Sequence, residues 1–145
     1  MDAAIRYLER LGQEATGNNH ASLRDGLVSA MDAIRNYEMV MSAEILTRLS
    51  DIDGVMVYGI CDQGQLHRRL PTICFTLNKK PADEVASYCA AHGVGVRDGN
   101  MYSPRLLARL GISPQAGALR ASLVHYNTLQ EIDIFIGLIR RLAEG

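Results

Sequence analysis

The chain has 145 residues, 48% of them apolar, and its 15 basic and 16 acidic side chains leave a formal net charge of −1. This length and apolar content predict a globular protein with a sizeable core. The near-neutral charge excludes a general attraction to nucleic acid, and no apolar run reaches the roughly 20 residues that span a bilayer. We therefore expect neither nucleic acid nor a membrane as a partner.

The N-terminus and the cysteines favour a cytoplasmic protein. The first residues, "MDAAIRYLERLG", carry acidic side chains where a secretory signal needs a basic segment before an apolar core. Cys61, Cys74 and Cys89 are odd in number and include no C-x-x-C pair, so they predict neither a disulfide framework nor a zinc site. The four histidines show no metal-ligand spacing either.

Residues 1–20 predict a short N-terminal helix and a connector. Ile5, Leu8 and Leu11 lie near one face of a helix over residues 2–12, whereas "GQEATGNNH" has no apolar periodicity. A long helix follows, with Ser22 as its N-cap and an end near Leu49, or roughly 40 Å at 1.5 Å per residue. Its apolar stripe comprises Leu27, Met31, Ile34, Met41 and Ile45, and further apolar residues outside it predict more exposed apolar surface than this chain can cover.

From residue 53 onwards, short strands alternate with turns and helices. Residues 55–60 and 72–77 predict a hairpin-like pair of strands around a polar turn, and Pro81 opens a helix that ends near residue 93. Residues 94–97 predict a strand, 105–110 a short helix and 118–124 a last strand, before a T-x-x-E capping box at Thr128 and Glu131 starts the final helix. The fold class is an α/β (α+β) sandwich, a small mixed or antiparallel sheet covered by helices.

Arg120 interrupts the apolar strand "ALRASLV". A buried, unpaired arginine is costly, so this side chain must reach solvent or meet an anion, and its planar fork suits a carboxylate. The alternation of a strand alone favours solvent, and a ligand role stays open.

Two segments carry a family resemblance. "GVGVRDGNMYSPRLLARLG" and "ALRASLVHYNTLQEIDIFIGLIRRL" resemble the C-terminal small domain of class V aminotransferases, the pyridoxal-phosphate-dependent fold-type-I enzymes that include cysteine desulfurases. The likeness covers residues 20–143, so residues 21–145 are expected to form that small domain. It implies that Arg120 binds the α-carboxylate of an amino-acid substrate, and that Arg97, Asn100 and Tyr102 line the substrate site. Arg97 could instead brace a loop, and Tyr102 could pack on its own helix.

The sequence also departs from the family pattern. Tyr102 stands where cysteine desulfurases carry their nucleophilic cysteine; Cys74 and Cys89 are expected in the core, and Cys61 in an accessible turn. Asn127 is expected to be structural, since it can bond to its own backbone at a helix start. His67, with its neighbouring arginines, is expected in a solvated turn.

Pyridoxal phosphate needs a Schiff-base lysine, an acid and a phosphate cup, and in the family these come from a large domain. Lys79 and Lys80 are the only lysines and fall in a predicted surface turn. The resemblance therefore implies a small domain without its cofactor-binding half, inactive alone, with the large domain as its partner and a homodimer as the assembly. A ferredoxin-like regulatory module that binds a small molecule is the alternative, and a ligand-free assembly protein is a third reading.

Overall fold

The computed structural model describes residues 1–17 and 22–145. Helix α1 spans Asp2–Thr16 and helix α2 spans Leu23–Ser50. The remaining elements are β1 (Val55–Tyr58), a 3-10 helix η1 (Gln63–Arg68), β2 (Thr72–Leu77), α3 (Ala82–Ala91), β3 (Arg97–Gly99), α4 (Pro104–Arg109), β4 (Ala118–Ser122) and α5 (Leu129–Glu144). None of the helices in these ranges is long and apolar enough to cross a membrane.

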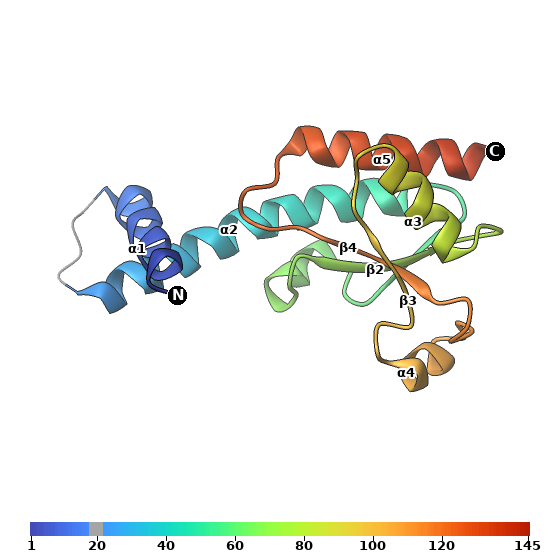
Figure 1. Cartoon of the computed structure of the whole chain (residues 1–145), viewed down its shortest axis with the longest axis horizontal. Coiled ribbons are helices and arrows are strands. Elements are labelled where there is room, and N and C mark those ends of the chain that lie inside the picture. The colour runs from blue at the N-terminus through green and yellow to red at the C-terminus, as the bar shows by residue number, and fades with distance from the viewer. Residues whose placement is uncertain (18–21) are drawn as a thin grey trace.

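The four strands form one sheet in the order β1-β2-β4-β3, with every described pair antiparallel. Helices α2, α3 and α5 lie together on one side of this sheet, and α4 lies on the other (Figure 1). The α/β sandwich is confirmed, and the sheet is antiparallel rather than mixed. From β1 onwards the strands and α-helices follow one another as β-β-α-β-α-β-α, which differs from the β-α-β-β-α-β order of the ferredoxin-like alternative.

Strand alternation explains which side chains form the core. Ile73, Phe75 and Leu77 of β2 are buried, and Leu119 and Ala121 of β4 join them on the helix-covered face. The ring of Phe75 meets that of Phe135 on α5 edge to face at 6.0 Å. The opposite face of the sheet is left for the polar residues that alternate with these.

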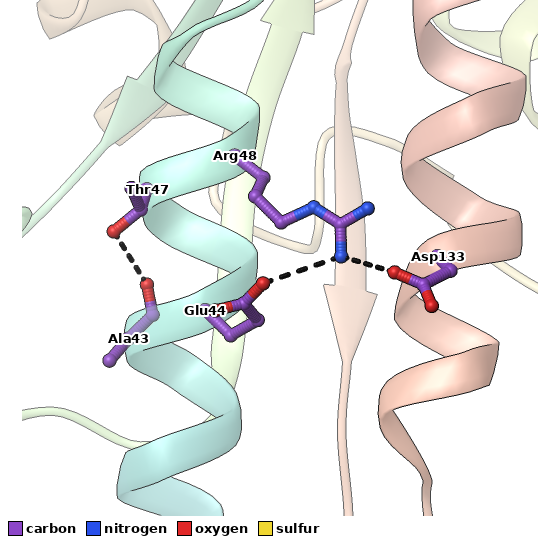
Figure 2. A network of polar contacts seen from close by, with 5 residues as sticks. All are labelled: Ala43, Glu44, Thr47, Arg48 and Asp133. Atoms are coloured by element: carbon purple, nitrogen blue, oxygen red, sulfur yellow. Dashed lines mark hydrogen bonds and ion pairs between the residues drawn. The ribbon is translucent and has the colours of Figure 1, made fainter.

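A polar network joins the two longest helices over the sheet (Figure 2). The Nη1 atom of Arg48 on α2 lies 2.5 Å from the carboxylate of Asp133 on α5 and 3.4 Å from that of Glu44. The hydrogen bond to Asp133 raises the pKa of Arg48. On the same helix, Thr47 donates its hydroxyl to the carbonyl of Ala43 at 2.9 Å. The Arg48–Asp133 ion pair links α2 and α5 at the surface, beside the apolar core that the two helices share.

The predicted connector over residues 12–20 is wrong in its first part, because α1 continues to Thr16 and ends at Gly17 with a left-handed φ of 67°. Gly12 lies inside the helix, where it touches α2 so closely that a Cβ would stand 2.0 Å from the carbonyl oxygen of Gly26. Gly12, which in the sequence suggests the end of a helix, therefore marks the point where α1 crosses α2.

Three other boundaries differ from the sequence predictions. Residues 63–68 form a 3-10 helix instead of an open turn, and the Asp62 side chain caps it by accepting a hydrogen bond from the Gly64 N–H at 2.9 Å. Pro81 is the N-cap of α3 and not its first residue. The third strand begins at Arg97 rather than ending there, because residues 94–96 form no ladder with β4.

The predicted N-cap of α2 and its predicted exposed apolar surface are both confirmed. Ser22 accepts a hydrogen bond from the N–H of Asp25, and burial is concentrated in the half that crosses the sheet. Toward the other end, α1 packs on α2 (Figure 1), and Val28, Met31 and Val40 stay exposed, the last at 62%. Exposed apolar residues of this kind can mark a surface that binds another protein.

The capping box predicted at the start of α5 is present. Glu131 accepts a hydrogen bond from the Thr128 N–H at 2.7 Å and one from the Asn127 side chain at 3.3 Å. These two hydrogen bonds lower the pKa of Glu131 below its usual value, and the bond from the Thr128 N–H has the larger effect.

This lowered pKa predicts acid sensitivity of the α5 start. A carboxyl with a depressed folded-state pKa stabilises the fold above its unfolded-state pKa, and that contribution is lost as the pH falls through the folded-state pKa. We expect Glu131→Gln to destabilise the chain at neutral pH and to match the wild type in acid, measured by urea unfolding at a series of pH values. A pH-independent difference would contradict this.

Candidate functional site

A row of polar and reactive side chains crosses the sheet on the face opposite the main core. The registers pair Tyr58 with Cys74, Cys74 with Arg120, and Arg120 with Arg97, so all four strands contribute one residue. Since Leu119 and Ala121 on either side of Arg120 are buried in the core, alternation directs Arg120 to this second face, where it is exposed. The predicted outward orientation of Arg120 is correct.

A cavity of about 460 Å³ lies at the edge of this row. Arg97, Asn100, Tyr102 and Arg120 all line it, together with Asp98, Gly99 and Met101. The four residues that the sequence predicts for a substrate site are therefore neighbours in space. Within residues 1–17 and 22–145, the side chains of Arg97 and Arg120 have no ion-pair or hydrogen-bond partner. Two guanidinium groups are thus available to an anion from outside the chain.

The loop after β3 is held in an unusual conformation. Met101 and Tyr102 have φ values of 52° and 59°, both in the left-handed region that side chains other than glycine rarely adopt. The side-chain oxygen of Asn100 accepts a hydrogen bond from the Tyr102 N–H at 3.0 Å, and the backbone carbonyl of Asn100 accepts one from the Ser103 N–H at 2.8 Å. Such strain gathers at binding and catalytic sites. Tyr102 is 91% exposed, so it does not pack on its own helix.

A contact between two glycines brings β3 and β4 together beside the cavity. Gly117, with φ 70°, precedes β4, and a Cβ placed there would lie 2.6 Å from the Cα of Gly99. Gly99 is the last residue of β3, two positions after Arg97. Only a glycine at position 117 allows this approach, which sets the spacing of the strands that carry the two arginines.

Asn127 is structural, as the sequence predicts. Its side-chain oxygen accepts the Val124 N–H at 2.8 Å, and its carbonyl accepts the hydroxyl of Tyr37 on α2 at 2.6 Å. These bonds shape the turn that leads from β4 into α5.

The three cysteines occupy different environments. Cys89 is buried in the main core, as predicted, and Cys61 is exposed with its Sγ 3.7 Å from the Gly59 carbonyl. The prediction for Cys74 is wrong, because it lies on the second face beside Arg120, half-buried against the small cluster that includes Leu107 and Ala118. Burial raises the pKa of the Cys74 thiol, which disfavours the thiolate needed for nucleophilic chemistry.

Arg69 and the histidines lie outside the cavity that Arg97 and Arg120 line. Arg69 donates to the carbonyls of Ile60 and Thr72, and burial lowers its pKa. His67 is exposed, as predicted. His92 contacts the Tyr88 carbonyl and His125 the Tyr7 hydroxyl, both at 2.8 Å. His20, also predicted to be isolated, lies outside the described residues. In the part of the chain the structure describes, no three potential ligands converge on a metal site.

The surroundings of Lys79 and Lys80 do not fit a pyridoxal phosphate site. They lie in the turn between β2 and α3, beside a cavity of about 280 Å³ whose described lining residues include no acid to face a pyridine nitrogen. Lys79 is itself exposed. The lining of this cavity therefore lacks the acid that the cofactor requires.

Sequence reasoning missed two members of the site. Tyr58 and Cys74 read as ordinary strand residues, and only the pairing of strands far apart in the chain places them in the row with Arg120. The alternation in "TICFTL" was the available signal, since it puts Cys74 opposite the core residues Ile73 and Phe75.

The fold has clear counterparts among solved structures. A cysteine desulfurase from Thermococcus onnurineus superposes with a TM-score of 0.71 over 85% of this chain and 30% of its own, at 24% identity. The Escherichia coli cysteine desulfurase CsdA superposes with a TM-score of 0.63 over 83% of this chain and 30% of its own, at 20% identity. At these identities the likeness shows the fold alone.

Sequence relatives point the same way. The chain is 30% identical over 142 residues to a probable cysteine desulfurase of Mycobacterium leprae, covering 98% of this chain and 19% of that protein. It is 31% identical over 141 residues to one of Staphylococcus aureus, covering 97% and 28%. The chain thus spans 19% and 28% of the length of these two relatives. The aminotransferase class-V family model matches residues 27–135, and the chain belongs to that family.

Proposed function

We propose that this chain is the small, C-terminal domain of a class V enzyme and that Arg120 binds the α-carboxylate of its amino-acid substrate. The observation that carries the proposal is the shared cavity: Arg97, Asn100, Tyr102 and Arg120 line it, and both arginines lack a partner within the described residues. A guanidinium pairs with a carboxylate through two parallel hydrogen bonds, so Arg120 both holds and orients the substrate. Residues 21–145 would form this domain, with 1–20 as its N-terminal arm.

The other three residues have separate tasks in this proposal. Arg97 adds a second positive charge from the neighbouring strand. Asn100 shapes the loop, since its side chain already holds the Tyr102 N–H. Tyr102 projects into the cavity mouth as a wall for the substrate, and no cysteine shares its loop, so the proposal does not include desulfuration through a cysteine nucleophile. Transamination and elimination both remain compatible with an arginine that binds carboxylate.

Pyridoxal phosphate would be bound by a large domain that this chain must meet. The cofactor provides the electron sink for reactions at the substrate Cα, and the present chain contributes substrate binding and orientation. We expect no turnover from the 145-residue chain alone. A cytoplasmic location stays a prediction from the sequence.

We also propose a homodimer, formed through the exposed apolar surface of α2. An uncovered patch of this kind favours self-association. Sedimentation should show concentration-dependent association of the chain, and Val40→Lys, which charges a residue 62% exposed, should weaken it. A monomer at every concentration would contradict the proposal for this surface.

The carboxylate role is tested by titrating the chain with L-alanine and following backbone amides by NMR. We expect saturable shifts in residues 97–102 and 118–122, and their loss in Arg120→Gln. Arg109→Gln is the matched control, because Arg109 is an exposed arginine of α4 that does not line the cavity. Shifts that survive unchanged in Arg120→Gln would refute the assignment.

A further inference from the structure

Tyr58 and Cys74 belong to the row on the second face of the sheet, yet neither lines the cavity at its edge. Both are half-buried against a small apolar cluster of Leu107, Ile112 and Ala118, which is separate from the main core. Leu107 is the member of this cluster that comes from α4, and it is only 3% exposed. The two strand residues therefore form part of the surface on which α4 packs through Leu107.

Backbone hydrogen bonds connect Leu107 with the loop that lines the cavity. The N–H of Leu107 donates to the carbonyl of Ser103 at 3.1 Å, and the N–H of Ser103 donates to the carbonyl of Asn100 at 2.8 Å. Met101 and Tyr102 lie between the last two residues in the chain. A movement of α4 over the sheet would therefore displace the cavity wall that Asn100 and Tyr102 form.

The loop needs such an anchor because its backbone is strained. Met101 and Tyr102 both have left-handed φ values, a conformation that persists in residues other than glycine only where the surroundings hold it. Within the described chain, the hydrogen bonds of residues 100–103 are all made inside residues 100–107, so they do not tie the loop to the sheet. The packing of Leu107 does, on the side of the loop opposite the glycine contact between β3 and β4.

We propose that Leu107 is a positioning residue for the substrate cavity. By packing against Tyr58 and Cys74 it fixes α4 on the sheet, and α4 in turn holds Met101 and Tyr102 in the conformation that keeps Tyr102 at the cavity mouth. This inference rests on the proposed function of the cavity and adds a residue that acts on binding without touching the substrate. The restraint comes from within this chain and needs no group from another domain.

Leu107→Ala provides the test. We expect residues 100–103 of the free chain to lose rigidity, measured by NMR relaxation of their backbone amides. If the binding conformation falls to about a tenth of the population, the affinity for L-alanine falls about ten-fold. Leu107→Met, which nearly conserves the side-chain volume, should restore most of that affinity. Leu106→Ala is the matched control, since Leu106 is the neighbouring leucine of α4 and is 55% exposed, and it should keep both rigidity and affinity.

The outcomes separate this inference from the proposed function and from a purely structural role. A residue that only stabilises the fold would change urea unfolding but not the affinity of the folded molecules. The main core does not include Leu107, so the fold should persist, and Leu107→Val, a smaller truncation, gives the same comparison should the alanine variant unfold.

Residues 100–103 that stay as rigid as in the wild type would overturn the task assigned to Leu107, whether or not L-alanine binds. Binding that depends on Arg120 and is equally tight in Leu107→Ala would overturn it as well, and would leave the role of Arg120 intact. No binding by the wild type, or binding independent of Arg120, would overturn both proposals.

Discussion

Replacing Arg120 with glutamine is expected to lower kcat/KM of the assembled enzyme by roughly 100-fold, the consequence of losing about 2–3 kcal/mol of charge-assisted binding. The side chain is exposed on the second face of the sheet and contributes nothing to the core, so the fold should persist. Steady-state kinetics of the chain combined with its cofactor-binding domain would measure the loss.

Two variants make this result specific. Arg120→Lys keeps the charge but loses the planar fork, so it should recover only part of the activity. Arg109→Gln removes a charge from α4 outside the cavity and should leave kcat/KM within about two-fold of the wild type, as expected of a surface substitution. A variant Arg120→Gln with full activity would remove the carboxylate role.

Gly117→Ala is expected to produce the largest loss of stability, roughly 2–4 kcal/mol in the free energy of unfolding. The alanine would take an unfavourable φ of 70° and would place its Cβ 2.6 Å from the Cα of Gly99, a backbone atom that cannot turn away. β3 must then separate from β4, which moves Arg97 away from Arg120. Urea unfolding and the amide signals of residues 97–99 would report the two effects.

Gly111→Ala is the matched control for that substitution. Gly111 has a similar φ of 76°, but nothing lies within 4 Å of a Cβ built there. It should therefore show only the conformational cost, about 1–2 kcal/mol. Equal losses for the two variants would mean that the contact between Gly117 and Gly99 is unimportant.

The parts of the fold that depend on local chemistry were predictable. The Ser22 cap and the Thr128–Glu131 box are each encoded within a few residues, and each is confirmed. The residues expected at the substrate site also lie together. They could be predicted because the loop after β3 and strand β4 are short segments that carry a recognisable family pattern.

The features that were missed depend on contacts between distant segments. Gly12 looks like a helix break until Gly26 is placed against it, and Cys74 looks like a core residue until its partner strands show which face is covered. The sheet order that pairs β2 with β4 brings Cys74 beside Arg120, and no local periodicity encodes that pairing.

We propose that this chain works with a pyridoxal phosphate domain, and the genomic reading frame upstream of the Met1 codon tests this proposal most directly. We predict that the flanking DNA encodes a cofactor-binding domain with a Schiff-base lysine, in the same frame or in a neighbouring gene. Flanking DNA that encodes no such domain would contradict the account, and Arg120 would then belong to a binding protein rather than to an enzyme.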